Sequence, residues 1–248
     1  MLGDTAPDRM LDQAQPITPQ IYRILRNRII RNDLKPGNRV SESEIARVYS
    51  VSRQPVREAF IKLAEQGLLA IRPQRGTLIT RIDYAAVLDA RFLREAIEAD
   101  IVKLLAAQPD PAMIADLRAQ IAQQRAAGTR PPGAFIGLDE TFHRRLASWA
   151  GKAGAWKLIE GLKSQMDRVR FLALKTFPTD KLVAQHAALV EAIAAADPAR
   201  AEACIRTHLR EVLNDLPEIV RANPDVFDLR DGDTPGSVTK PIQGGNTP

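Results

Sequence analysis

The residues best suited to chemistry in this sequence are its histidines, of which there are only three: His143, His186 and His208. Asp139 lies four residues before His143 in the stretch LDETFHRRL, so on a helix the two side chains project from one face, a turn apart. His186 and His208 lie in LVAQHAALVEAI and ACIRTHLREVL, in step with the apolar residues of those stretches. The pattern predicts that all three imidazoles face inward from three different helices.

A metal ion is one way to accommodate these side chains. A single histidine on an apolar stripe is more often a hydrogen-bonded core residue, but three buried imidazoles each need a partner and would repel one another when protonated. A divalent cation removes both difficulties, and the helices of a bundle can direct such ligands to one point. The sequence therefore predicts a metal site formed by Asp139, His143, His186 and His208. Zinc is the first choice of ion, with nickel, manganese and iron as alternatives.

Two other uses of the same residues stay open. Enzyme sites with three histidine ligands leave a position for an activated water, but they also need a general base, and nothing singles out Glu95 or Glu98 for that role. Arg94 could bind the carboxylate of a ligand bidentately, or it could form an i,i+4 salt bridge with Glu98.

Helices are the elements expected to position this site. Residues 83–220 predict about six amphipathic helices, with Ala, Leu and Ile at 3.6-residue spacing and no strand signal. This pattern favours an all-α antiparallel helical bundle.

A basic segment precedes the bundle. Residues 17–81 contain 13 Lys and Arg against 5 Asp and Glu, a net charge of +8, which leaves −3 on the rest of a chain whose total is +5. A compact basic segment joined to a mildly acidic body indicates a module that binds a polyanion.

The order of elements in the basic segment indicates a winged helix-turn-helix. Ser41 and Glu44 form a capping-box pattern before a short helix, and Ser52 is a candidate cap for the next one, VSRQPVREAFIKLAEQGLL. Two strands around residues 73–76 would form the wing. The predicted DNA contacts are Ser52, Arg53, Gln54 and Arg57 on the recognition helix, and Arg72 and Arg75 on the wing. Overall the fold class is mainly α, a winged helix-turn-helix followed by the bundle.

The same stretches carry a resemblance to known regulators. VSRQPVREAFIKLAEQGLL followed by RPQRGTLIT resembles the GntR family of bacterial transcription regulators over nearly all of residues 17–81. The resemblance implies that Ser52, Arg53, Gln54, Arg57 and Gly76 contact DNA. Position 43, where some relatives carry a DNA-contacting arginine, is Ser43 here.

The second half of the chain is similar to the FCD ligand-binding domain of the FadR subgroup. The similarity rests on LREAIEADIVKLLAA, LDETFHRRLA, QHAALVEAI and THL, and it runs from about residue 83 to 215. It implies an effector domain in which Asp139, His143, His186 and His208 bind metal and Arg94 lies near the effector. The expected helix count is closer to the VanR-type branch, and the four ligand positions favour a small organic acid over a bulkier effector such as acyl-CoA.

The ends of the chain are expected to be less ordered. Residues 1–16 are polar and predicted to be disordered, and residues 222–248 are predicted to form a flexible tail, with Val226, Phe227 and Leu229 able to dock locally. The N-terminus has no secretory signal pattern, no apolar run approaches the roughly 20 residues of a membrane span, and Cys204 is the only cysteine. These features predict a cytoplasmic protein that does not enter a membrane.

Together the sequence predicts a ligand-responsive transcription regulator rather than an enzyme. It would act as a homodimeric repressor on a palindromic operator in double-stranded DNA, and a small carboxylate bound beside the metal would release it. The alternatives are a metal-dependent enzyme with an appended DNA-binding domain, a regulator that senses the metal directly, and a purely structural metal.

Overall fold

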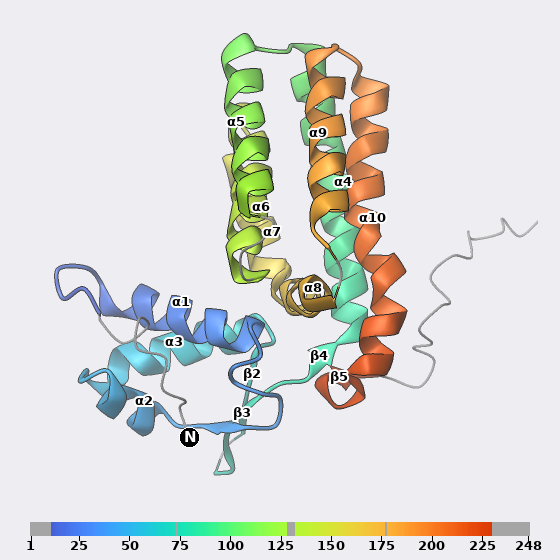
Figure 1. Cartoon of the computed structure of the whole chain (residues 1–248). Coiled ribbons are helices and arrows are strands. Elements are labelled where there is room, and N and C mark those ends of the chain that lie inside the picture. The colour runs from blue at the N-terminus through green and yellow to red at the C-terminus, as the bar shows by residue number, and fades with distance from the viewer. Residues whose placement is uncertain (1–10, 73, 128–131, 177, 230–248) are drawn as a thin grey trace, which may run out of the picture.

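The computed structural model describes residues 11–72, 74–127, 132–176 and 178–229. Figure 1 shows a small N-terminal domain of helices and a sheet beneath an upright bundle of long helices. The fold class predicted from the sequence, mainly α with an N-terminal winged helix-turn-helix and a helical bundle, is confirmed.

The N-terminal domain is a winged helix. Its helices are α1 (Ile17–Ile30), α2 (Glu42–Val48) and α3 (Arg53–Glu65), and its strands are β1 (Arg39–Val40), β2 (Leu69–Arg72) and β3 (Gly76–Ile79). The strands form an antiparallel sheet in the order β1-β3-β2. The helices pack through fully buried apolar side chains such as Ile21, Val56 and Phe60. The two wing strands were predicted, whereas β1, only two residues long, was not.

The wing turns where the backbone reaches positive φ. Gln74 has φ of 59° and Gly76 has φ of 86°, and Arg72 pairs with Gly76 in the ladder. Because only glycine adopts such a φ at no steric cost, Gly76 is suited to close this hairpin. Pro73, part of the predicted turn, lies outside the described residues.

Two predicted helix caps do not form. Ser41 and Ser52 have the extended backbone of N-cap residues, but neither side chain accepts a hydrogen bond from its helix. Aspartates serve instead at two helices of the bundle, because Asp83 accepts from the Ala86 N–H and Asp197 accepts from the Arg200 N–H.

The C-terminal domain is the predicted helical bundle. Within the described residues it has seven helical segments: α4 (Tyr84–Ala107), α5 (Pro111–Ala127), α6 (Pro132–Trp149), α7 (Ala153–Leu162), α8 (Ser164–Thr176), α9 (Asp180–Ala194) and α10 (Pro198–Ala222). The prediction was about six, because the break at Lys163 between α7 and α8 was not predicted, although Gly161 lies two residues before it. α8 lies at the base of the bundle beside the winged domain (Figure 1).

A short parallel sheet ties the domain junction to the end of the bundle. Strand β4 (Ile82–Asp83) pairs with β5 (Phe227–Asp228), which follows the 3₁₀ turn η2 (Pro224–Val226). Phe227 is fully buried in a cluster with residues of α4, α8 and α10. This docking lies within the tail that the sequence assigned to residues 222–248, at the place where Val226 and Phe227 were expected to dock locally. Residues 230–248 lie outside the described residues.

The N-terminal residues that the structure describes are also held in place. Leu11 packs against the core of the winged domain, and the Gln20 side chain donates to the Asp12 and Pro16 carbonyls. The sequence predicted disorder for residues 1–16, and Gln20 of α1 forms hydrogen bonds with the described part of that segment, residues 11–16. Residues 1–10 lie outside the described residues. Over the described part of the chain, none of the helices has the length and apolarity that crossing a membrane would require.

Candidate metal centre, effector pocket and DNA-binding surface

The three histidines and Asp139 meet at one point inside the bundle. Asp139 and His143 come from α6, His186 from α9 and His208 from α10, and all four are buried. The Nε2 atom of His208 lies 3.2 Å from that of His143 and 3.0 Å from that of His186. The Asp139 carboxylate lies 3.6 Å from His186 Nε2 and 3.8 Å from His143 Nε2. The structure thus brings together the four residues that the sequence singled out.

The other ring nitrogen of each histidine has an acceptor of its own. Nδ1 of His143 lies 2.5 Å from a Glu98 oxygen, Nδ1 of His186 lies 2.8 Å from Gln124 Oε1, and Nδ1 of His208 lies 3.0 Å from Gln185 Oε1. An acceptor at Nδ1 favours the tautomer with its proton there, which leaves a lone pair on Nε2. Three lone pairs therefore point at one another, an arrangement that repels unless a cation lies among them.

The spacing of the four side chains suits a metal ion. Both oxygens of Asp139 are buried; Oδ2 forms an ion pair with Arg170, whereas Oδ1 has no hydrogen-bond partner within the described residues. Ligands of a tetrahedral zinc with bonds of about 2.0–2.1 Å lie about 3.3 Å apart, and the separations here lie on either side of that value. The residues present fit a divalent ion bound by three imidazoles and one carboxylate.

Burial and neighbouring charge set the protonation of the ligands. Burial lowers the pKa of His186 to about 3, so the ring is neutral and able to bind metal at pH 7. Burial also lowers the pKa of His208, and the two other histidines add to the effect. Burial alone would raise the pKa of Asp139, but Arg170 and smaller contributions from neighbouring groups together outweigh it and hold the pKa well below its usual range. Each of these three ligands is thus in its metal-binding form.

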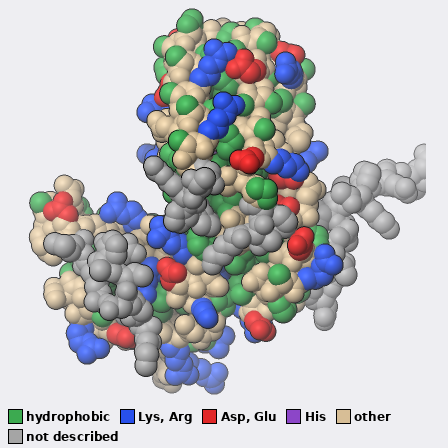
Figure 2. Space-filling view, viewed as in Figure 1, with side chains coloured by type: hydrophobic (Ala, Val, Ile, Leu, Met, Phe, Trp, Pro, Cys, Tyr) green, Lys and Arg blue, Asp and Glu red, His purple; other side chains and the backbone are tan. Residues whose placement is uncertain are grey.

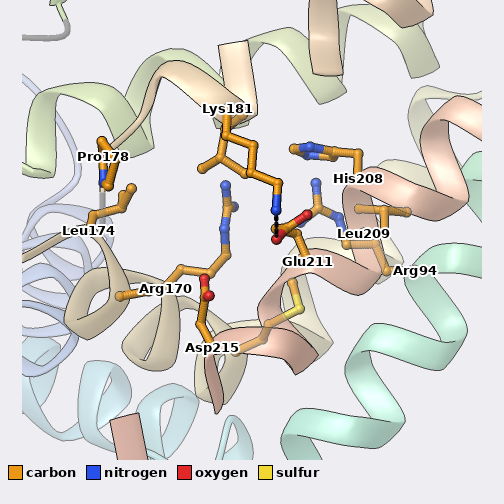
Figure 3. A pocket seen from close by; sticks show the side chains of 12 residues that line it. Arg94, Arg170, Leu174, Pro178, Lys181, His208, Leu209, Glu211 and Asp215 are labelled. Atoms are coloured by element: carbon orange, nitrogen blue, oxygen red, sulfur yellow. Dashed lines mark hydrogen bonds and ion pairs between the residues drawn. The ribbon is translucent and has the colours of Figure 1, made fainter. Parts of the chain in front are cut away.

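A cavity of about 200 Å³ opens beside the centre, between α4, α8, α9 and α10. Figure 3 shows Arg170, Lys181 and Asp215 around this space, with His208 and Arg94 at its inner end. Half of the lining residues are apolar: Met166, Ala173, Leu174, Pro178, Leu182 and Leu209. The cavity is therefore lined both by His208 of the metal centre and by cationic side chains, and its volume suits a small organic acid.

Arg94 fits both alternatives that the sequence left open, a salt bridge with Glu98 and a position beside a ligand. It is buried, its Nε donates to Glu98, and it also lines the cavity. The salt bridge therefore does not remove Arg94 from the pocket. Instead it links the pocket to Glu98, which contacts the metal-site histidine His143.

Four polar residues around the centre were missed or not singled out in the sequence: Glu98, Gln124, Gln185 and Arg170. Gln185 directly precedes His186, and Glu98 follows Arg94 by one turn. Neither spacing indicates that the side chain would form a hydrogen bond with a histidine. Arg170 lies 31 residues after Asp139 and places Nη2 2.6 Å from that carboxylate. Such contacts depend on how α4, α5, α6, α8 and α9 pack, so local sequence patterns do not show them.

The predicted DNA contacts are all exposed on the winged domain. Ser52, Arg53, Gln54 and Arg57 are exposed at the start of α3, and Arg72, Arg75 and Gly76 are exposed on the wing. Arg53 lies 3.5 Å from Glu42, and Gln54 donates to Glu58, so both side chains are held only by surface contacts. Basic side chains are visible along the lower edge of the molecule in Figure 2, where Figure 1 places the β2–β3 turn. A helix N-terminus with exposed Arg and Gln beside a basic wing suits a major groove and its phosphates.

Comparison with known proteins agrees with this arrangement. Residues 17–79 match the bacterial regulatory proteins of the gntR family, and residues 89–211 match the FCD domain. The chain belongs to the GntR family of transcription regulators, with an FCD domain as its C-terminal part. It is 38% identical over 222 residues to the HTH-type transcriptional repressor RspR of Escherichia coli K12, which covers 89% of this chain and 97% of the relative.

Further matches agree with the family and with the fold. The Nta operon transcriptional regulator of Aminobacter aminovorans is 27% identical over 81% of this chain and 95% of its own length. The structure of E. coli McbR/YncC aligns with a TM-score of 0.69 at 18% identity, covering 86% of this chain and 99% of that one. A GntR regulator from Rhodococcus sp. RHA1 aligns with a TM-score of 0.65 at 24% identity, covering 83% and 98%. The family and its relatives are transcription regulators rather than enzymes, so this protein is a DNA-binding transcription regulator.

Proposed function

We propose that this regulator is a cytoplasmic, homodimeric repressor that leaves a palindromic operator when a small carboxylate binds beside a divalent metal ion. The observation that carries the proposal is the convergence of three imidazole lone pairs and Asp139 at the wall of a cavity that Arg94 and Arg170 also line. Asp139, His143, His186 and His208 would hold the ion, with zinc as the first choice. The bound ion would attract the effector carboxylate as an additional ligand beyond these four.

Cationic side chains of the cavity would orient that carboxylate. Arg94 and Arg170 line its inner end, and the cavity is too small for an effector the size of acyl-CoA. A guanidinium matches a carboxylate in shape and charge, which favours a small organic acid over a neutral ligand.

Helix α8 offers a route from the cavity to the DNA-binding domain. Met166 and Arg170 of α8 line the cavity, while Asp167 of the same helix accepts from Arg26 of α1 at 2.7 Å. Arg168 donates to the Thr80 carbonyl at 2.9 Å. A ligand that moves α8 would therefore act on the docking of the winged domain, provided that it binds the two arrangements with different affinity.

Close packing makes this docking sensitive to small movements. Gln165 of α8 donates to the Gly67 carbonyl at 2.7 Å, and a Cβ at position 67 would lie 3.1 Å from the Gln165 amide nitrogen. Gly67 also has φ of 68°, a conformation that favours glycine.

Metal binding can be tested by elemental analysis of purified protein. The double variant Asp139→Ala, His186→Ala should lose the stoichiometric metal that the wild type carries. The matched control is Asp100→Ala, an exposed carboxylate outside the centre. Stoichiometric metal in the double variant would exclude this site.

DNA recognition can be tested on a duplex that the wild-type protein selects from a random library. Arg53→Ala or Arg57→Ala should weaken binding by roughly 1–3 kcal/mol if the arginine contacts a base. Arg118→Ala, an exposed arginine of the bundle, should bind like the wild type. Unchanged affinity in both recognition-helix variants would remove α3 as the reading helix.

The effector role can be tested on the same duplex by adding acetate, pentanoate and glutarate, with and without a chelator. Release by a carboxylate that the chelator prevents would support the proposal. Release by the chelator alone, with no effect of any acid, would instead identify a direct metal sensor. An acid response that persists after metal removal would make the metal structural or dispensable.

A further inference from the structure

The outer part of the cavity holds a carboxylate without a partner. The three cationic side chains of the lining, Arg94, Arg170 and Lys181, each form an ion pair with a carboxylate of the fold. Glu211 is the partner of Lys181, at 2.5 Å. Asp215, one turn further along α10, forms neither a hydrogen bond nor an ion pair with any residue that the structure describes, yet it lines the cavity and is half-buried.

Such a carboxylate costs free energy in the folded protein. Partial burial removes water from a charged group, and the nearby Lys181, which is paired with Glu211, compensates for it only in part. Burial raises the pKa of Asp215, and the neighbouring Glu211 raises it further. A cationic group on the ligand would relieve both effects at once.

The position of Asp215 fixes where on the ligand that group must lie. His208 and Asp215 are seven residues apart on one face of α10, about 10 Å along the helix axis. His208 adjoins the inner end of the cavity, so Asp215 faces the opposite end of any ligand whose carboxylate lies beside the histidines (Figure 3). A ligand that reaches both must be several carbons long.

The wall between the two ends indicates what the middle of the ligand is. Leu174, Leu182 and Leu209 line it, and they offer no hydrogen bonds. A sugar acid would bury its hydroxyl groups against these side chains without partners, which is costly. A dicarboxylate would bring its second charge against Asp215 and Glu211, since Lys181 is already engaged.

We propose that the effector is an ω-amino carboxylate of about five carbons, with its carboxylate at the His208 end of the cavity, its methylene chain along the leucines and its ammonium on Asp215. This proposal rests on the proposed function, because it takes the inner end of the cavity as the carboxylate site. Asp215 is then the residue that selects an amino acid over a simple fatty acid.

Calorimetric binding to zinc-loaded protein tests the assignment with pentanoate, 5-aminopentanoate and glutarate. Wild type should bind 5-aminopentanoate roughly tenfold more tightly than pentanoate, the effect expected of one partly buried ion pair. Glutarate should bind most weakly. In Asp215→Asn the preference for the amine should disappear, while pentanoate should bind as in the wild type and glutarate should gain.

The control variant is Glu218→Gln, which changes an exposed carboxylate on the next turn of α10 that does not line the cavity. It should keep the wild-type order of the three acids. Within the ω-amino series, glycine should bind far more weakly than 5-aminopentanoate because it cannot reach both ends.

Two failures have different meanings. If pentanoate binds as tightly as 5-aminopentanoate, or if the amine preference survives in Asp215→Asn, this inference is overturned while the carboxylate effector of the proposed function stands. If none of the acids binds the zinc-loaded protein, both are overturned.

Discussion

Arg170 and Asp139 form an ion pair in which Nη2 of the arginine lies 2.6 Å from Oδ2 of the aspartate. The aspartate is fully buried, and the arginine is the cation that offsets its charge. Because Asp139 belongs to the candidate metal centre and Arg170 belongs to α8, the pair joins that centre to the helix on which the winged domain docks. A metal ion at the centre would share the carboxylate with Arg170 and so change the balance of charge on α8.

Removing this arginine should make folding depend on metal. Arg170→Met leaves Asp139 buried without its cation, and breaking a buried pair in this way costs roughly 3–5 kcal/mol. Zinc should recover much of the loss, because the ion also compensates the carboxylate. Urea unfolding with zinc and with a chelator measures both values.

Arg144→Met is the control, since Arg144 and Glu160 are 3.7 Å apart and both about half exposed, so its effect should stay below about 1 kcal/mol. Equal losses with and without zinc in Arg170→Met would contradict the assignment of Asp139 as a ligand.

Glu98 should tune the metal affinity through His143. The carboxylate accepts from the His143 Nδ1–H, which orients the ring and strengthens Nε2 as a ligand. In Glu98→Gln the contact becomes weaker, and zinc affinity should fall roughly 10- to 100-fold. Competition with a chromophoric chelator measures it.

Glu95 provides the matched control on the same helix. It is equally buried but pairs with Arg91, Arg206 and Arg210 instead of a histidine. Glu95→Gln should therefore keep zinc affinity within about threefold, as expected of a residue that contacts no metal ligand. A similar loss in the two variants would mean that Glu98 acts only through the stability of α4.

The sequence alone predicted the four residues of the metal centre because helical periodicity places each of them on the inward-facing side of its helix. Asp139 and His143 share a helix face by spacing, and His186 and His208 each fall in step with apolar neighbours. It could not supply Glu98, Gln124 or Gln185 as partners, since these meet the histidines only through helix packing across 45, 62 and 23 residues of chain.

The same reasoning explains the other differences. The wing strands were predictable from β-type residues around Gly76, whereas β5 pairs with β4 across more than 140 residues and gives no local signal. The serine caps were inferred from residue type, but a favourable N-cap backbone at Ser41 and Ser52 does not require the hydroxyl to bond to the helix.

Acid should weaken the fold partly through Glu95. Burial would raise the pKa of this carboxyl, but hydrogen bonds from its arginine partners outweigh it and lower the pKa to about 2. A folded-state pKa below the unfolded value of about 4.3 means that the ionised form stabilises the fold, fully above that value. This stabilisation is lost as pH falls from about 4.3 toward 2. Urea unfolding at pH 6 and pH 3 should therefore show a smaller loss for Glu95→Gln than for the wild type. Parallel losses in the two proteins would show that the arginines do not stabilise the ionised carboxyl.

The contact between α1 and α8 should carry the effector signal. Arg26 is largely buried and donates to Asp167 at 2.7 Å, so Arg26→Gln breaks an ion pair between the domains without touching α3 or the wing. Operator affinity in the absence of effector should change by no more than about threefold, while the coupling between effector and operator should fall by roughly 0.5–2 kcal/mol. Operator titrations with and without a saturating effector acid measure the coupling as a ratio of affinities. Arg23→Gln is the control, an exposed arginine on the same helix that should leave the ratio unchanged. If Arg26→Gln keeps the wild-type ratio, α8 does not transmit the signal through this pair. The β4–β5 pairing then becomes the route to test, because β4 follows the wing at the domain junction and β5 follows α10.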